Sequence, residues 1–510
     1  MIAETISPPG ASTEPPRTAA TSGPGAELKR GALTNMVAML ASNFRGIFTF
    51  LVARLLGPAA LGTFSVAWAT TDLLSRAGMF ALDNSIITFI ARAEAVGDRS
   101  RSRALFRLAV LMAVGQCTLL AVVAILALRF FGTRLGLDPQ MVAAVCVMLG
   151  AMPGVALYRI NTAVSRGMKV MRHDIFSRGI TETIGTTIAF LVVFNLGLTT
   201  FAPQIAGIVG TAAAGIVAFA LAWSLFRSGP RRDPSFSLRC EAKRLWIHAA
   251  PISAYDLLNA VIVRSDVIML ACFIGRAPGV TLPVVGIYGV VVEVAGGLRK
   301  VNQVFNPIFA PIVAGMTVDG EQGRAAAAFS HVARWMLWIL MPAVAVMALS
   351  GPVILGIYGP AFREGATWLT IVALACATNA FVGLAETVIM VQKPKLNLFN
   401  SAIACLVALV ANVWLIGRFG VIGAAFGILI PYLVLGILRY RTLRQVFRWR
   451  DPWHDVDEPL IAALIATVPA LLVRFTIAGT PGQLAAGLIF LAVYLVLWKR
   501  HRAVEGEVIL

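Results

Sequence analysis

Long apolar runs, separated by short polar gaps, cover most of the chain. Each run is close to the roughly 17–25 residues that an α-helix needs to cross the hydrocarbon core of a bilayer. The pattern therefore predicts an all-α integral membrane protein with about fourteen transmembrane helices. The predicted spans are 33–55, 60–91, 106–128, 139–158, 177–196, 203–226, 245–273, 284–314, 332–350, 366–390, 397–416, 420–438, 459–477 and 482–498.

A weak internal repeat divides the first twelve predicted spans into two groups of six. Gly62-Thr63-Phe64-Ser65-Val66 in the second span matches Gly286-Ile287-Tyr288-Gly289-Val290 in the eighth, and at the same offset Arg76 falls on Lys300. A repeat of this kind predicts two pseudo-symmetric bundles around a V-shaped central cavity that can open to either side of the membrane. The last two spans lie outside the repeat.

Charge is sparse and unevenly placed. Only 13% of the 510 residues are charged, whereas soluble domains carry about 25%, and the mean hydropathy is +0.81. The net charge of +18 could suggest nucleic acid, but most of the basic residues lie in every second gap between spans. This alternation is typical of cytoplasmic loops, so it predicts that both termini are cytoplasmic and that nucleic acid is not a partner.

The same pattern predicts the domain organisation. It comprises a disordered cytoplasmic tail (1–28), an N-terminal six-helix bundle (29–226), a cytoplasmic linker (227–244), a C-terminal six-helix bundle (245–440), an amphipathic cytoplasmic segment (441–458), two additional transmembrane helices (459–498) and a cytoplasmic tail (499–510).

Metal, cofactor and disulfide chemistry find no support in the sequence. The six Cys and five His are scattered, with no CxxC pair and no HExxH spacing. Cys in an apolar segment usually behaves as a small hydrophobic residue. We therefore expect no metal site and no cofactor.

Five basic residues inside the predicted spans are the candidate substrate-binding residues: Arg45, Arg76, Arg264, Arg299 and Lys300. Each costs roughly 2.5–3.5 kcal/mol at a bilayer centre if it faces lipid, so we expect these side chains to face a wet cavity. A guanidinium suits phosphate because its planar fork donates two parallel hydrogen bonds. The alternative is pairing with acids on the same helix, Asp72 for Arg76 and Asp256 for Arg264.

Carboxylates inside the spans are candidates for a cation relay. Intramembrane acids often mark proton or sodium pathways, and Asp256 and Glu293 are the two candidate ion-coupling residues. The alternative is that the acids only balance the buried arginines. The full set is Asp72, Asp83, Glu182, Asp256, Asp266, Glu293 and Glu386.

Several short stretches resemble a known family. They are Ala53-Arg54-Leu55-Leu56-Gly57-Pro58-Ala59-Ala60-Leu61-Gly62-Thr63-Phe64, then Lys393-Pro394-Lys395-Leu396-Asn397, and then Asn412, Gly420, Gly423-Ala424-Ala425 and Gly427. Together they resemble polysaccharide-repeat flippases of the multidrug/oligosaccharidyl-lipid/polysaccharide exporter superfamily. The resemblance implies an alternating-access transporter, not an enzyme, in the bacterial inner membrane. It also implies an undecaprenyl-pyrophosphate-linked oligosaccharide as substrate, and a polysaccharide polymerase or export machinery as a partner beside membrane lipids.

Three alternatives stay open at this point. The fourteen-span arrangement also resembles peptidoglycan lipid-precursor flippases. A cation-coupled multidrug exporter of the same fold would be expected to line its cavity with acids, whereas the five basic residues favour an anionic substrate. A membrane-embedded glycosyltransferase or ligase needs a large extracytoplasmic loop or an acidic pair outside the membrane, but the predicted outer gaps are short.

Overall fold

The structure, a computed structural model, describes residues 45–132, 134, 136–227, 237–305, 322–449 and 456–504. Helices make up nearly all of these residues, and no strand occurs among them. In the described part, ten helical stretches are long and apolar enough to cross a membrane. The predicted tail 1–28 lies outside the described residues, as do residues 228–236 of the linker 227–244 and parts of 441–458 and 499–510.

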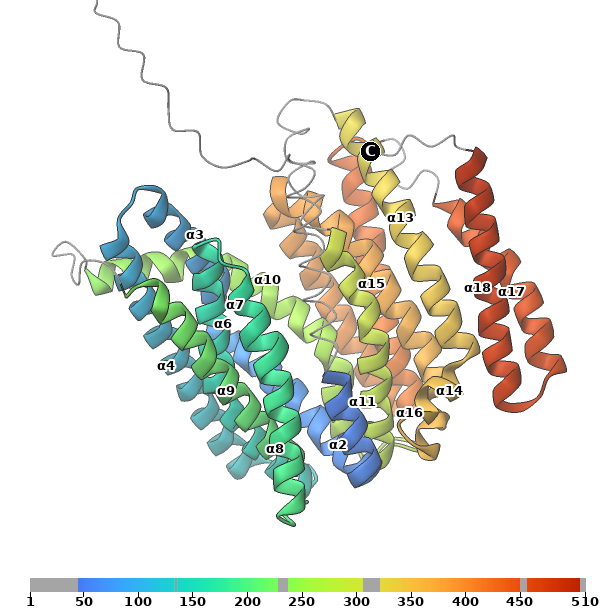
Figure 1. Cartoon of the computed structure of the whole chain (residues 1–510), viewed down its shortest axis with the longest axis horizontal. Helices are drawn as coiled ribbons and strands as arrows, with labels where there is room; N and C mark the ends of the chain where they lie inside the picture. The colour runs from blue at the N-terminus through green and yellow to red at the C-terminus, as the bar shows by residue number, and fades with distance from the viewer. Residues whose placement is uncertain are drawn as a thin grey trace, which may run out of the picture.

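The first half of the chain forms one group of helices, seen in blue and green at the left of Figure 1. It contains α2 (Arg45–Met79), α3 (Leu82–Ala95), α4 (Arg99–Phe131), α5 (Pro139–Met148), η1 (Leu149–Ala151), α6 (Met152–Gly167), α7 (Arg172–Asp174), η2 (Ile175–Glu182), α8 (Thr183–Asn195) and α9 (Ala202–Leu225). We call this group the N-terminal half.

The second group follows at the right of Figure 1 and is called the C-terminal half. It contains α10 (Leu238–Cys272), α11 (Leu282–Gly296), η3 (Gly297–Arg299), α13 (Gln322–Leu349), α14 (Gly351–Gly356), η4 (Pro360–Gly365), α15 (Ala366–Gln392) and α16 (Pro394–Gln445). Two more helices, α17 (Asp457–Thr476) and α18 (Gly479–Val504), pack against α13 at its outer side. The predicted two-bundle fold with two additional helices is confirmed.

Two glycines separate predicted spans that the helices otherwise join. α2 contains the end of the first predicted span and the start of the second, and it turns at Gly57, whose φ is +78°. α16 joins the eleventh and twelfth spans and turns at Gly420, whose φ is +59°. A residue without Cβ adopts positive φ at little cost, so both reversals occur where the sequence supplies glycine. The second span itself is broken at Phe80 and Ala81, which also have positive φ.

The two halves contact each other at the lower end of Figure 1 and diverge toward its upper edge. Near the lower end, α2 and α11 cross so closely that a Cβ on Gly286 would collide with Pro58 O and Gly62 N. Arg54 Nε also donates to Ile357 O at 2.9 Å, and Arg276 Nη2 donates to Gly136 O at 2.9 Å. The repeat-related glycines Gly62 and Gly286 therefore meet at the junction of the halves.

Helix α10 connects the two halves along its length. Its first turns contact the N-terminal half, where Glu241 pairs with Arg101 at 2.9 Å and Trp246 stacks on Phe80. Its last turns contact the C-terminal half, where Ser265 accepts from Asn412. The stretch between these contacts carries Asp256 and Arg264, so the fold places both residues where the halves face each other.

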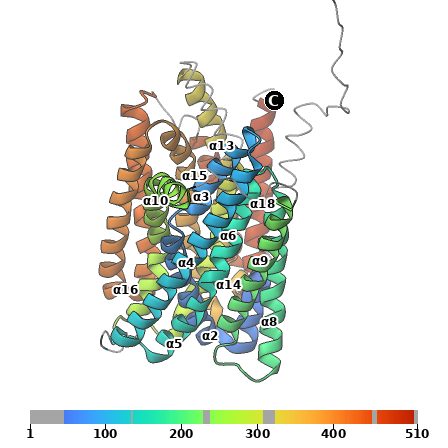
Figure 2. The same ribbon diagram turned by 90° about the vertical axis from the view of Figure 1, so that its left-hand side faces the viewer.

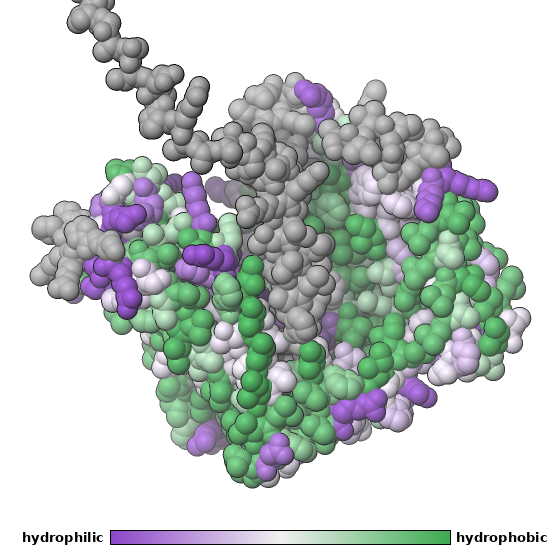
Figure 3. Space-filling model, in the orientation of Figure 1, coloured by the Kyte–Doolittle hydropathy of each residue, from purple (hydrophilic) through white to green (hydrophobic). Residues whose placement is uncertain are grey.

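The distribution of hydrophobic side chains on the surface agrees with the prediction of a membrane-spanning protein. On the face seen in Figure 3, hydrophobic side chains cover the flanks of both halves and hydrophilic ones gather toward the upper and lower edges. An apolar belt between two polar rims is the surface expected of a protein that spans a bilayer. The chain is a multi-pass membrane protein.

Candidate functional site

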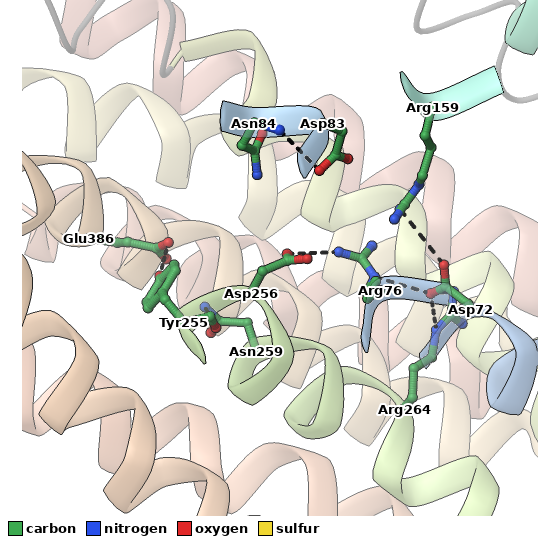
Figure 4. Close-up of polar contacts among 10 residues, drawn as sticks. All are labelled: Asp72, Arg76, Asp83, Asn84, Arg159, Tyr255, Asp256, Asn259, Arg264 and Glu386. Carbon is green, nitrogen blue, oxygen red and sulfur yellow. Dashed lines mark hydrogen bonds and ion pairs between the residues drawn. The ribbon is translucent and has the colours of Figure 1, made fainter. Parts of the chain in front are cut away.

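Two charged helices face each other between the halves. On α2, Asp72 and Arg76 are one helical turn apart, and on α10, Asp256 and Arg264 are about two turns apart, so each pair shares one face of its helix. The ion pairs cross from one helix to the other, as Figure 4 shows. Arg76 Nη1 lies 2.9 Å from Asp256 Oδ1, and Arg264 Nη2 lies 3.1 Å from Asp72 Oδ2.

Asp72 is the centre of this arrangement. Besides Arg264, it contacts Arg76 of its own helix at 3.6 Å and Arg159 of α6 at 3.9 Å. Arg264 Nε also donates to Asp72 Oδ2 at 3.1 Å. We call Asp72, Arg76, Arg159, Asp256 and Arg264 the interhalf cluster.

The interhalf cluster has an excess of positive charge and is reachable from outside. Three guanidinium groups face two carboxylates. The side chains of Arg76 and Asp256 are 28% and 30% exposed to solvent, although they lie between the halves. A multivalent anion could take the place of Asp256 on Arg76, because guanidinium donors bind phosphate as well as carboxylate. The arrangement is therefore suited to reversible anion binding.

The pairing differs from the alternative that the sequence left open. The spacing suggested that each arginine pairs with the acid of its own helix, but the shorter contacts of Arg76 and Arg264 go to the opposite helix. Helical spacing reports only neighbours on one helix, so it could not reveal partners that tertiary packing brings together. The crossed contacts make the cluster a link between the halves rather than a feature of either.

The other predicted basic residues lie apart from the interhalf cluster. The guanidinium of Arg299 lies over Gly296, beside Tyr432 and Cys376 inside the C-terminal half. Lys300 follows it in the chain and is half-buried. Arg45 opens α2, but its side chain is outside the described residues. Their substrate-binding role stays a prediction.

The two candidate ion-coupling residues both touch the opposite half. Glu293 of α11 accepts a hydrogen bond from Thr49 of α2 at 2.7 Å, and Asp256 pairs with Arg76. A carboxylate whose partner lies on the other half changes its surroundings whenever the halves move. The geometry is compatible with a coupling role, which stays a prediction.

Sequence reasoning missed two charged residues. Arg159 and Arg439 were both assigned to cytoplasmic gaps, yet Arg159 lies inside α6 and Arg439 inside α16. Arg439 has no exposed surface and binds Glu386 at 3.0 Å, while Glu386 also accepts a hydrogen bond from Tyr255. Their positions at the ends of predicted spans concealed them, because helices α6 and α16 continue beyond the apolar runs.

A family model described as "Polysaccharide biosynthesis protein" matches residues 28–312 of the chain. The match covers more than half of the sequence and includes all five residues of the interhalf cluster. The chain belongs to the polysaccharide biosynthesis protein family. No curated protein sequence matches it.

Solved structures of two transporter groups share the fold of this family member. The lipid II flippase MurJ in an inward closed conformation aligns with a TM-score of 0.66 and 13% identity, covering 93% of this chain and 99% of that one. An inward-facing multidrug resistance MATE family transporter of the MOP superfamily aligns with a TM-score of 0.61 and 13% identity, covering 82% and 98%. The eukaryotic MATE transporter AtDTX14 aligns with a TM-score of 0.59 and 14% identity, covering 84% and 96%. At these identities the likeness establishes a transporter-type fold.

Proposed function

We propose that this protein is an alternating-access flippase for a polyprenyl-pyrophosphate-linked oligosaccharide, the undecaprenyl-linked repeat unit of a surface polysaccharide such as exopolysaccharide, capsule or lipopolysaccharide O-antigen. The observation that carries the proposal is the interhalf cluster, with its excess of guanidinium groups between two halves that diverge at one end. A pyrophosphate is the anionic part of such a substrate, and forked guanidinium donors suit it.

In the proposed cycle, the substrate's phosphates replace carboxylates on the arginines. Binding releases Asp256 from Arg76 and weakens the hold of Asp72 on Arg264, which removes the crossed ion pairs between α2 and α10. The halves then close at the end where they now diverge and separate at the Gly62–Gly286 junction. Asp256 and Glu293, once free of their partners, are the groups that would take up a coupling cation.

The proposed orientation follows the charge pattern. The gaps rich in Lys and Arg lie at the upper edge of Figure 1, so that edge is proposed to be cytoplasmic in the bacterial inner membrane. The conformation is then open toward the side on which a lipid-linked precursor is made, and it belongs to the loading step of the cycle. This assignment is consistent with a transporter and not an enzyme.

A second candidate substrate is a peptidoglycan lipid precursor. The MurJ structure covers 93% of this chain, whereas the MATE structures cover 81–84%. A cation-coupled drug exporter is less well supported, because the interhalf cluster is basic and would repel cationic drugs.

The test combines a deletion with two variants. Deleting the protein should abolish a surface polysaccharide and leave lipid-linked repeat units on the cytoplasmic side. Arg76→Gln should also stop export, and so should Arg76→Gln combined with Asp256→Asn, if Arg76 binds phosphate. If the double variant regains full export, Arg76 serves only to pair with Asp256, and the anion-binding role is wrong.

Arg101→Gln is the matched control for these variants. Arg101 pairs with Glu241 at 2.9 Å, the same distance as Arg76 from Asp256, but outside the interhalf cluster. Export should persist in this variant. Normal polysaccharide with altered drug sensitivity in the deletion strain would instead favour the exporter, and a lethal deletion with arrested cell-wall synthesis would favour the peptidoglycan precursor.

A further inference from the structure

The interhalf cluster continues into a row of polar side chains on the C-terminal side. Helix α10 packs against α3 of the N-terminal half and against α16 of the C-terminal half (Figure 2). On α10, Asn259 is four residues after Tyr255 and three after Asp256, so it neighbours both on the helix surface. Figure 4 shows Glu386, Tyr255, Asn259, Asp256 and Arg76 one after another. We call Tyr255, Asn259 and Glu386 the polar row.

Glu386 is held by two donors and still reaches the space between the halves. Arg439 Nη2 donates to one carboxylate oxygen at 3.0 Å, and the Tyr255 hydroxyl donates to the other. The Arg439 side chain has no exposed surface, whereas the Glu386 side chain is 30% exposed, as is that of Asp256. A carboxylate that faces lipid is costly. The exposed part of Glu386 therefore faces the same space as Asp256.

The two ends of this arrangement favour different chemical groups. Around Arg76, three guanidinium groups face two carboxylates and suit phosphate. At Glu386 the cation lies behind the acid, so a ligand there meets a carboxylate and a phenol, which do not attract phosphate. Each Glu386 oxygen accepts one hydrogen bond from the protein and keeps a lone pair for another. Two neighbouring hydroxyl groups are the donors that suit such a carboxylate.

Asn259 and Tyr255 supply the other contacts that a sugar requires. Asn259 Nδ2 donates to Tyr255 O at 3.2 Å, and an amide has a second N–H and a carbonyl oxygen for a ligand. The Tyr255 ring has an apolar face beside its hydroxyl, and this face suits the C–H side of a pyranose ring. Acceptors, a donor and an aromatic face together fit a neutral polyhydroxyl ligand better than a metal ion or a second anion.

We propose that the polar row is the subsite for the first sugar of the lipid-linked substrate, an inference that rests on the proposed function. With the pyrophosphate on Arg76, the sugar joined to it lies against Asn259 on the facing helix, and Glu386 accepts from its hydroxyl groups. A site that hydrogen-bonds a hydroxyl group discriminates strongly against a ligand that lacks it. The polar row thus selects the glycan, whereas the arginines bind any lipid pyrophosphate.

The test compares the affinities of two lipid probes for the purified full-length protein in detergent. One probe is undecaprenyl pyrophosphate, and the other is the lipid-linked oligosaccharide extracted from the deletion strain. Glu386→Gln should weaken binding of the oligosaccharide probe about tenfold, because a hydrogen bond to a charged acceptor is lost. Asn259→Ala should weaken it about threefold, as for a neutral hydrogen bond, and decides the test if Glu386→Gln folds poorly. Both variants should bind undecaprenyl pyrophosphate as the unmodified protein does.

Asn195→Ala and Glu458→Gln are the matched controls. Asn195 of α8 donates to Leu191 O at 2.7 Å, the same contact with the preceding turn that Asn259 makes, and it lies on the exposed surface. Glu458 is an arginine-paired acid of similar exposure, away from the polar row. Both controls should bind the two probes normally. Equal losses for the two probes in the polar-row variants, or unchanged binding of the oligosaccharide probe, would overturn the sugar subsite.

Arg76→Gln separates this inference from the proposed function. It should weaken both probes by a similar factor, because both carry the pyrophosphate. If it weakens neither while the polar-row variants still lose the oligosaccharide probe, the sugar subsite stands and the phosphate site is wrong. If the deletion strain accumulates no lipid-linked oligosaccharide, the proposed function is wrong and the sugar subsite falls with it.

Discussion

Two sets of arginine–carboxylate contacts in this protein differ in what they connect. In the interhalf cluster, Arg76 and Arg264 reach across from one half to the other, and their side chains stay partly exposed. In the C-terminal half, Arg439 connects α16 to Glu386 of α15. Arg439 itself has no exposed surface, whereas the Glu386 side chain is 30% exposed, and Arg439 also donates to Val382 O at 3.2 Å. Two properties therefore distinguish the sets: the exposure of the side chains and the half on which the partner lies. Exposed pairs between the halves can exchange partners, whereas buried pairs within one half hold a bundle together.

Removing Arg439 should produce the largest loss of stability. Arg439→Met removes a cation with no exposed surface from Glu386, whose own side chain is 30% exposed. The loss should therefore approach, but not exceed, the about 3–5 kcal/mol typical of breaking a fully buried pair. Thermal unfolding of the purified protein in detergent measures the loss. Arg444→Met, on the exposed side of the same helix, is the control and should shift the midpoint little. Equal midpoints for the two variants would mean that burial does not distinguish the two sets.

Adding a methyl group at the junction of the halves should have the next largest effect. Gly286→Ala places a Cβ against Pro58 O, so α2 and α11 must move apart. Overpacking of this kind costs about 1–3 kcal/mol. Gly297→Ala is the control, because a Cβ there meets nothing within 4 Å. The measurement is the unfolding midpoint together with cysteine cross-linking across the halves, and unchanged cross-linking in Gly286→Ala would contradict a tight junction.

The two acids of the interhalf cluster should differ in how much each contributes to the stability of the folded protein. Asp72 contacts three arginines, whereas Asp256 forms its ion pair with Arg76 and has a more exposed side chain. Asp72→Asn should therefore cost about 1–3 kcal/mol, as for a hydrogen-bonded charged group, and Asp256→Asn below about 1 kcal/mol. Chemical unfolding of both variants under one set of conditions provides the comparison. If Asp256→Asn destabilises as much as Asp72→Asn, the cluster holds the fold rather than exchanging partners.

The architecture could be predicted from the sequence because each signal for it lies in a short stretch of the chain. These signals are the apolar runs, the glycines at turns and the charged gaps. Apolar runs marked the helices, and the turns at Gly57 and Gly420 occur within one or two residues of the expected gaps. The repeat also aligned Gly62 with Gly286, which the structure places in contact. A backbone crossing this close requires small residues on both helices, so the repeat carried information about the junction.

The candidate site was only partly predictable. Arg76, Asp72, Asp256 and Arg264 stood out because charge inside an apolar run is costly. The sequence did not reveal that these residues pair across the two helices, because that pairing depends on how α10 lies against α2. Arg159 and Arg439 lie just beyond apolar runs, where a loop and a helix end have the same composition. If each predicted span were extended by one helical turn, Arg159 and Arg439 would fall inside a span and count as intramembrane charges.

The smallest effect is expected at the edge of the C-terminal half, where burial is least. Arg334 of α13 and His501 of α18 lie 3.3 Å and 3.0 Å from Glu458 of α17. The Glu458 side chain is 36% exposed, so solvent screens these contacts and each is worth less than about 1 kcal/mol. Glu458→Gln should lower the unfolding midpoint only slightly. The packing of α17 and α18 on α13 should persist, because Ala466, Phe490 and Trp338 form an apolar cluster there. Proteolysis between α16 and α17, compared before and after the substitution, measures this packing. Release of the two helices by Glu458→Gln would show that an exposed pair can hold them, and exposure would then no longer separate the two sets of contacts.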